Sequence, residues 1–176
     1  MILTLLNKQT LQLINRKQLK YSLVAAEKDY FLAMALKILE ESPLFSTLVF
    51  KGGTAIHHCY LPQSRFSEDL DFTSLDKDLK SEAVTALFKP HSFFEVKKLY
   101  TSQATIKIER LKYSGVLDQP NSLKFEVDFL QNWQVVSEKR HDEIDLIYYH
   151  YDVFNKPQWI EDMVGKLQFE TIDPRE

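Results

Sequence analysis

Two aspartates one residue apart, Asp69 and Asp71, are the first residues in this sequence whose type and spacing suggest chemistry. In an extended strand, alternate side chains share a face, so the stretch EDLDF puts these two carboxylates together and turns Leu70 and Phe72 into the core. The later stretch LKFEVDFL alternates in the same way and places Asp128 on its polar face. Two strands therefore each offer an acidic face, and together these faces could hold a divalent cation.

The spacing of the pair gives a physical reason to expect that cation. Side chains two positions apart on a strand start roughly 6.6 Å apart, and at an effective dielectric constant of about 20 two negative charges at that distance repel by about 2.5 kcal/mol. Oxygen ligands favour Mg²⁺ or Mn²⁺ over Zn²⁺. We therefore interpret Asp69, Asp71 and Asp128 as metal ligands and catalytic acids. Glu126 shares the face of Asp128 and is either a further ligand or a solvated neighbour, of which we favour the neighbour. The alternative is a solvated strand face, because D-x-D is a short and common pattern.

The chain has four glycines, and Gly52 and Gly53 stand side by side after the apolar run STLVF. Adjacent glycines let the backbone approach a ligand closely, and the first turn of a following helix presents free N–H groups to an anion. Such a turn could hold phosphate oxygens, with the Thr54 hydroxyl as a further donor. The alternative is a strand-to-helix turn without a ligand, since the spacing matches neither a Walker loop nor a Rossmann fingerprint.

Residues that flank the turn and the acids extend this hypothesis. Lys51 could neutralise a phosphate or could be a solvated lysine at a strand end, and Arg65 and Ser67 could contact phosphate or hold the loop before the acids. A phosphate-binding turn followed by metal-binding acids predicts attack by a hydroxyl on the α-phosphate of a nucleoside triphosphate, with pyrophosphate leaving.

The remaining reactive residues do not form a second site. His57, His58 and Cys59 are adjacent on an expected helix, where their side chains diverge and cannot supply a tetrahedral zinc site. Five basic residues on two expected strands could follow an RNA backbone or could simply form a charged outer face. They are Lys97, Lys98, Lys107, Arg110 and Lys112.

Hydrophobic periodicity predicts the elements that position these residues. Helices are expected at 3–19, 24–41, 54–60, 77–88 and 158–169, and strands at 46–50, 68–73, 93–100, 104–113, 123–130 and 145–153. Helices that flank a sheet of five or six strands indicate an α/β or α+β fold. Without a linker or repeat, we expect a single domain over 1–176 with N-terminal helices within 1–42 packed on the core.

Composition limits the environment of the protein. A chain of 176 residues with a formal net charge of −3 has no chain-wide basic field, so a nucleic-acid partner would need a local patch. The single cysteine excludes an internal disulfide and fits a reducing cytoplasm. No apolar run is long enough to span a membrane and no cleavage site follows the apolar start, so we expect neither a membrane partner nor a signal peptide.

The motifs together resemble the AbiEii/AbiGii type of nucleotidyltransferase-fold toxin. The resemblance is carried by EKDYFLAMALKILEESPL (27–44), LVFKGGTAI (48–56), RFSEDLDF (65–72) and FEVDF (125–129), and more weakly by WIEDMVGKL near the end. It covers most of the chain from about residue 23. The fold that it implies is a polymerase-β-like nucleotidyltransferase core, with a mixed β-sheet flanked by helices.

The resemblance also implies roles for individual residues. Gly53 and Thr54 match the phosphate-binding pair of the family, Asp69 and Asp71 its metal-binding acids, and Asp128 its third acid. Lys166 would contact the nucleotide phosphates.

The activity implied by the family is magnesium-dependent transfer of a nucleotide from a nucleoside triphosphate to tRNA, in a bacterial cell that also makes a cognate antitoxin. Two alternatives remain open: transfer to a protein or small molecule, and a catalytically silent module that only binds. Family members commonly continue into a helical region with an Arg-Asp motif, so we expect that this chain lacks that region and that its activity could be affected.

Overall fold

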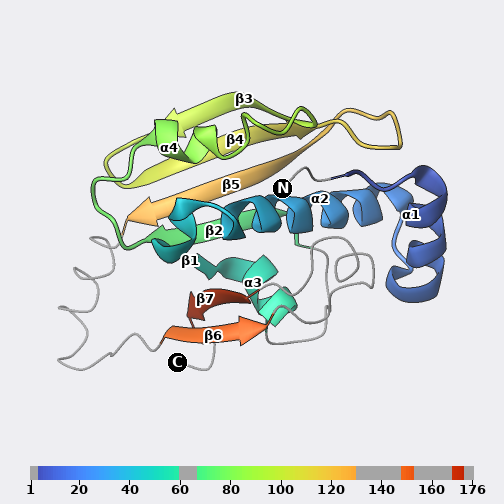
Figure 1. Ribbon diagram of the computed structural model, residues 1–176, viewed down its shortest axis with the longest axis horizontal. Coiled ribbons are helices and arrows are strands. Elements are labelled where there is room, and N and C mark those ends of the chain that lie inside the picture. Colours follow the sequence, from blue (N-terminus) through green and yellow to red (C-terminus); the bar gives the residue numbers. More distant parts are fainter. Residues whose placement is uncertain (1–3, 60–66, 130–147, 153–167, 173–176) are drawn as a thin grey trace.

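The computed structural model describes residues 4–59, 67–129, 148–152 and 168–172. Its strands form one seven-stranded sheet in the order β3-β4-β5-β2-β1-β7-β6 (Figure 1). The strands are β1 (Leu48–Lys51), β2 (Asp69–Ser74), β3 (Phe94–Thr101), β4 (Thr105–Tyr113), β5 (Asn121–Phe129), β6 (Tyr148–Asp152) and β7 (Gln168–Ile172). Strands β2 and β5 are parallel, as are β1 and β7, whereas the other neighbours are antiparallel. The expected mixed sheet with helices is therefore confirmed.

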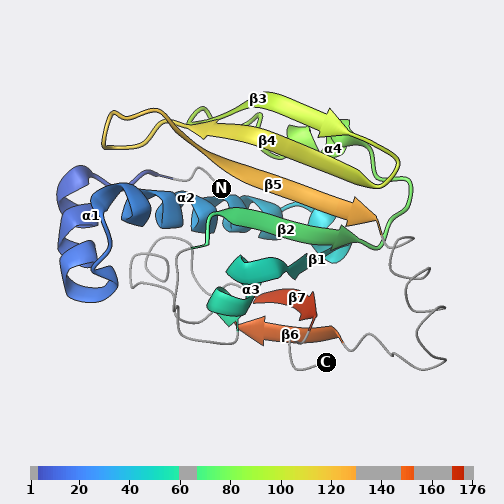
Figure 2. The same cartoon turned by 180° about the vertical axis from the view of Figure 1, so that it is seen from behind.

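Helices α2 and α4 cover one face of this sheet. The helical elements are α1 (Lys8–Ile14), a π-helical turn (Asn15–Leu19), α2 (Leu23–Glu40), a 3-10 turn (Pro43–Ser46), α3 (Gly52–Cys59) and α4 (Ser81–Ala86). Figure 2, seen from behind, shows the opposite face, where the strands stand in front of α2 and α4. No helix in the described ranges has the length and apolarity needed to cross a bilayer.

The long helix α2 begins and ends where its sequence requires. The Ser22 side chain accepts a hydrogen bond from the Ala25 N–H at 3.2 Å, which satisfies a free donor of the first turn. Pro43 follows the last turn and cannot continue the helix. On the buried side of the helix, Phe31 stacks on Tyr113 of β4 with ring centroids 4.1 Å apart. Burial of such a ring contributes about 1.5–3 kcal/mol to the stability of the folded state. This packing holds the helix against the sheet.

Aromatic rings from the strands and from the segment after α4 complete the core on the same face. Phe88, two residues after α4, packs edge-on against Phe94 of β3 and Phe125 of β5, with centroids 5.4 and 5.6 Å away. Phe72 of β2 lies between Phe125 and Phe50 of β1 at 4.9 and 5.1 Å. Because these apolar residues alternate with the polar ones along each strand, the acids of β2 and β5 are turned to the other face.

A buried glutamate of α2 anchors the loop between β4 and β5. Glu27 is 1% exposed, and its Oε1 accepts a hydrogen bond from the Leu117 N–H at 3.0 Å. A Cβ at Gly115 would lie 2.2 Å from the same Oε1. The loop can therefore approach the carboxylate this closely only because residue 115 has no side chain.

Gly115→Ala is expected to lower the free energy of unfolding by about 2–3 kcal/mol, since the new methyl displaces a buried, hydrogen-bonded carboxylate. Urea denaturation followed by circular dichroism measures this change. The neighbouring exposed substitution Ser114→Ala is the control and is expected to stay within about 0.5 kcal/mol of the wild type. Equal stability of the two variants would contradict the anchoring role of Glu27.

A second buried acid of α2 makes stability depend on pH. Asp29 is 1% exposed, and burial raises its pKa to about 7. The folded state then binds a proton that the unfolded state releases near pH 4. This contribution to stability is fully present below about pH 4 and is lost as the pH rises towards 7.

The free energy of unfolding is therefore expected to fall by about 1–3 kcal/mol between pH 5 and pH 8, and Asp29→Asn should remove most of this dependence. Urea denaturation at each pH unit measures both chains. The exposed substitution Glu82→Gln serves as the matched control and should keep the wild-type profile. A variant Asp29→Asn with an unchanged profile would show that another group causes the dependence.

Several predicted elements differ from the structure. Within the described residues, the sheet has seven strands rather than five or six. The helix predicted over 3–19 is divided into α1 and a π-helical turn. That predicted over 77–88 is reduced to α4 because the Asp76 side chain accepts from the Asp78 N–H and forms a turn first.

The last predicted helix, 158–169, is wrong at its C-terminal end. Most of the predicted helix, residues 158–167, lies outside the described residues. Its last two residues, 168 and 169, belong to strand β7. Strand β7 pairs in parallel with β1, where Phe50 stands beside Thr171. This pairing satisfies the backbone groups on the edge of β1 that β2 leaves open. The helix was predicted from the spacing of apolar residues along the sequence, and that spacing carries no information about pairing with β1.

Candidate active site

The acids lie on the face of the sheet opposite α2 and α4, and the strand register determines their neighbours. Asp71 of β2 stands beside Lys51 of β1 on one side and beside Glu126 of β5 on the other. Asp69 stands beside Lys124, and Asp128 stands beside Thr73 two positions further along. Four carboxylates and two lysines thus come from three adjacent strands.

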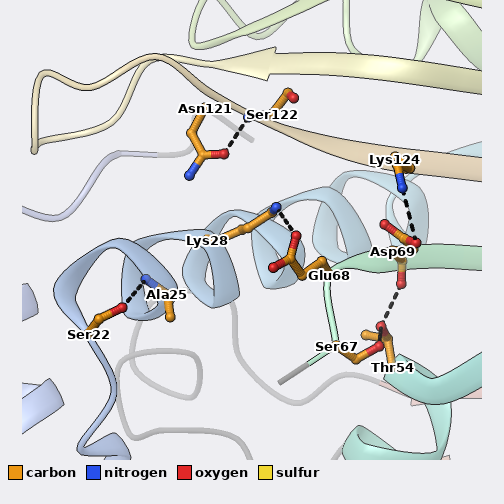
Figure 3. Close-up of polar contacts among 10 residues, drawn as sticks. All are labelled: Ser22, Ala25, Lys28, Thr54, Ser67, Glu68, Asp69, Asn121, Ser122 and Lys124. Atoms are coloured by element: carbon orange, nitrogen blue, oxygen red, sulfur yellow. Dashed lines mark hydrogen bonds and ion pairs between the residues drawn. The ribbon is translucent and has the colours of Figure 1, made fainter. Parts of the chain in front are cut away.

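Lysines balance three of the four carboxylates. Lys51 contacts Asp128, and Lys107 of β4 lies 2.5 Å from a Glu126 oxygen. Lys124 lies 3.7 Å from Asp69 Oδ2, as Figure 3 shows. Within the described part of the chain, Asp71 has no ion pair of this kind. Asp71 is therefore the central acid and the one whose charge is least compensated.

The environment of Asp71 disfavours its charged form. Burial is the largest cause of its raised pKa, and the negative charges of Asp69 and Glu126 raise the pKa further. Lys51 lowers it, and Asp128 contributes a smaller increase. A carboxylate in such surroundings gains most from a bound cation, which would offset the repulsion from the neighbouring negative charges.

The glycine turn touches this same acid. Gly52 has a φ of +79°, a conformation that residues with a side chain rarely adopt. A Cβ at this position would lie 2.5 Å from Asp71 Oδ2. The turn that opens α3 therefore lies directly against the central carboxylate, so a group held by the backbone of the turn would meet an ion held by the acid.

Thr54 connects α3 to the start of β2. Its side chain is 1% exposed, and Oγ1 lies 2.5 Å from the Asp69 carbonyl oxygen and 2.8 Å from Ser67 Oγ (Figure 3). These hydrogen bonds fix the strand that carries both aspartates. In this arrangement Thr54 and Ser67 support the site from behind, and a phosphate contact from either hydroxyl would require this network to open.

The donor chemistry fits Mg²⁺ or Mn²⁺, because the described residues of the acid face offer oxygen ligands, most of them carboxylates. In the described conformation, however, no three acidic, histidine or cysteine residues of the described chain are gathered closely enough to hold an ion. The ion pair between Lys51 and Asp128 keeps one expected ligand occupied. Binding of an ion by all three aspartates would therefore require Lys51 to release Asp128.

The structure brings together five of the residues predicted from the sequence. Lys51, Gly52, Asp69, Asp71 and Asp128 meet at the acid face, with Gly53 next to them on α3. Thr54 and Ser67 lie immediately behind. The other two predicted residues, at positions 65 and 166, lie outside the described residues.

Sequence reasoning missed the residues that share the acid face through register. Glu126, interpreted as a solvated neighbour, stands directly beside Asp71 and raises its pKa more than Asp128 does. Lys107 and Lys124 were not predicted to pair with acids, yet each does so. The alternation of polar residues in β4 and β5 indicated their face, but the acids that they meet depend on the order of strands.

Comparisons with known proteins agree with this fold. A family model described as the nucleotidyl transferase AbiEii toxin of a type IV toxin–antitoxin system matches residues 35–152. Among curated proteins, none matches the sequence.

Two solved structures resemble the chain in fold. MenT4, a nucleotidyltransferase toxin from Mycobacterium tuberculosis H37Rv, aligns with a TM-score of 0.62 at 20% identity and covers 93% of this chain. A nucleotidyltransferase-like protein from H. pylori aligns with a TM-score of 0.53 at 18% identity and covers 88% of this chain. The chain spans about half of each of these proteins, 55% and 56% of their lengths.

Proposed function

Because the chain belongs to the family of AbiEii nucleotidyltransferase toxins, we propose that it transfers a nucleotide from a nucleoside triphosphate to a hydroxyl of RNA. The acceptor in this proposal is tRNA, and Asp69, Asp71 and Asp128 are the catalytic acids that bind Mg²⁺ or Mn²⁺. The chain acts in the bacterial cytoplasm and is neutralised by a cognate antitoxin. The family description as a toxin–antitoxin component supports this setting.

The contact between the glycine turn and the central acid is the observation that carries the proposal. A Cβ on Gly52 would meet Asp71 Oδ2 at 2.5 Å, so the backbone of the turn and the carboxylate leave no room for a side chain between them. A triphosphate needs both a backbone that can approach its oxygens and a cation that bridges them. The glycine turn supplies the backbone, the carboxylate of Asp71 supplies a ligand for the cation, and the two lie in direct contact.

The residues of the chain have distinct roles in this reaction. The turn at Gly52 and Gly53 approaches the triphosphate, and Lys51, once released from Asp128, supplies a positive charge beside it. Arg65, from its position in the sequence just before the acids, and Lys166, by resemblance to the family, contact the phosphates as well. Thr54 and Ser67 were predicted to bind nucleotide, and their hydrogen bonds support a further role in holding Asp69 in place.

The acids provide a place where the attacking oxygen and the α-phosphate can meet in line. Asp69, Asp71 and Asp128 would hold divalent ions there, and such ions would lower the pKa of the attacking hydroxyl and stabilise the leaving oxygen. A bond forms between the acceptor oxygen and the α-phosphorus, the bond between the α-phosphorus and the bridging oxygen breaks, and pyrophosphate leaves. The proton of the acceptor hydroxyl passes to solvent.

The experiment that tests this function is incubation of the purified chain with Mg²⁺, total bacterial tRNA and each nucleoside triphosphate labelled on its α-phosphate. Label in RNA, absent in EDTA, is the expected result. The same nucleotides labelled on the γ-phosphate are the matched control and should label nothing, since pyrophosphate leaves.

A parallel incubation with cell proteins and small molecules separates the alternatives. Label in protein or in a small molecule, with none in RNA, would replace the acceptor that we propose. Nucleotide binding without label in any fraction would indicate a silent module and would overturn the proposal.

A further inference from the structure

A basic pocket lies on the outer strands of the sheet, away from the acids. Its volume is about 490 Å³. The lining residues are Lys97, Arg110, Lys112, Pro120, Asn121 and Ser122. Three of them are cations, two carry polar groups that can donate hydrogen bonds, and none is acidic. The lining is therefore suited to an anion.

Bulges in β3 and β4 gather the cations. Lys98 of β3 stands beside Arg110 of β4, and the register shifts on both sides of Lys98. The pairing of β4 with β5 also shifts between Ile108 and Leu111, so that two β4 residues, Glu109 and Arg110, stand opposite Lys124. A bulge redirects the side chains of the strand that contains it. Lys97, which the register shift of β3 leaves without a partner on β4, and Arg110 therefore both lie at these irregularities, and both line the pocket, whereas Lys98 pairs with Glu109.

The charges of this pocket are only partly compensated. Lys97 pairs with Glu95 at 2.5 Å, whereas Arg110 and Lys112 have no ion pair within the described chain. The Asn121 side-chain oxygen accepts a hydrogen bond from the Ser122 N–H at 2.8 Å, which leaves the amide nitrogen as a donor. Such a pocket attracts a ligand that carries several negative charges.

The pocket and the acids are joined along β5. Lys112 stands beside Ser122, and Ser122, Lys124 and Glu126 follow at alternate positions, the last of them beside Asp71. Four residues of strand cover roughly 13 Å at about 3.3 Å per residue. One RNA strand that lies along this path could therefore contact the pocket with its phosphates and reach the acids with its terminal hydroxyl. Lys124, which is 55% exposed, lies between the two ends.

We infer that Arg110 and Lys112 bind the phosphate backbone of the acceptor RNA roughly 13 Å from the site where its hydroxyl is modified. The inference rests on the proposed transfer to RNA and adds a separate binding site for that substrate. It also explains how an RNA can approach a group of four carboxylates, because the cations of the pocket and Lys124 offset the repulsion along the path.

The test is binding of a fluorescein-labelled 12-nucleotide single-stranded RNA, measured by anisotropy at several NaCl concentrations without nucleotide or divalent cation. The double variant Arg110→Gln, Lys112→Gln should weaken binding about tenfold near 100 mM salt and reduce the slope of log K against log[salt] by about 1.4, or about 0.7 for each phosphate that the protein no longer neutralises. Arg110→Gln alone, at an exposed position, should give about half of the slope change.

The matched control is Arg16→Gln, Lys17→Gln, which changes the net charge equally on exposed residues of the π-helical turn after α1. This control should bind RNA like the wild type. Equal weakening in both pairs, or wild-type binding by the pocket variant, would overturn the inference. So would loss of nucleoside triphosphate binding by the pocket variant with RNA binding intact, because the pocket would then belong to the nucleotide.

The binding assay is independent of catalysis. If the wild type binds RNA through these residues but transfers no label to it, the proposed function fails while the RNA site stands. If label is transferred and the pocket variant retains wild-type RNA affinity, the function stands and the RNA site is wrong.

Discussion

Gly52→Ala is expected to reduce nucleotide transfer at least about a hundredfold. The residue has a φ of +79°, which costs a residue with a side chain about 1–2 kcal/mol, and the new methyl would lie 2.5 Å from Asp71 Oδ2. Either the turn or the carboxylate must move, and a displacement of about 1 Å in a reacting group can cost a factor of 100 in rate. Initial rates with α-labelled nucleotide measure the effect.

A second substitution at this position separates backbone strain from the steric clash. Asparagine tolerates positive φ better than alanine but also carries a Cβ. Gly52→Asn is therefore expected to recover part of the stability that Gly52→Ala loses in urea denaturation, without recovering activity. Full activity in either variant would show that the close contact between the turn and Asp71 is dispensable.

Asp71→Asn is expected to change activity and stability in opposite directions. Removal of a metal-binding oxygen should lower transfer by a factor of about 10³ or more, since stabilisation by the ion is worth several kcal/mol. In EDTA, however, the variant should match the wild type in stability or exceed it by up to about 1 kcal/mol, because a half-buried charge beside Asp69 and Glu126 is removed.

Thermal unfolding with and without Mg²⁺ provides a readout other than activity. Ligand binding to the folded state raises its stability, so Mg²⁺ should raise the Tm of the wild type and leave that of Asp71→Asn unchanged. The matched control Asp78→Asn makes the same chemical change at an exposed residue and should retain both the activity and the response. Activity above a tenth of the wild-type rate in Asp71→Asn would refute its role as a metal ligand.

The local features of the fold and of the acid face were predictable from the sequence. Alternation in EDLDF and LKFEVDFL correctly indicated strands with apolar residues on one face, and the structure buries Leu70, Phe72, Phe125 and Val127 completely. The prediction succeeds because all side chains on one side of a strand are buried together or exposed together. The alternation of apolar and polar residues therefore indicates which side faces the core. The motifs around the glycine turn indicated the family, which the family model confirms.

Relationships between distant strands were not predictable in the same way. The position of Glu126 beside Asp71 depends on β5 lying parallel to β2 in one register, and a shift of two residues would preserve every face while changing every neighbour. The bulges that gather Arg110 and Lys97 are likewise properties of paired strands rather than of either sequence alone. The strand β7 was missed for the same reason.

The ion pair between Lys51 and Asp128 has a consequence for folding. Four carboxylates on the acid face are accompanied by the three ammonium groups of Lys51, Lys107 and Lys124. The charges of these carboxylates and ammonium groups nearly cancel without a bound ion. A zinc finger differs, because its thiolates have no such counter-charges and the domain does not fold without its metal. The sheet can therefore assemble in a metal-free chain. In the reaction that we propose, Lys51 neutralises Asp128 during folding and releases it when a cation binds.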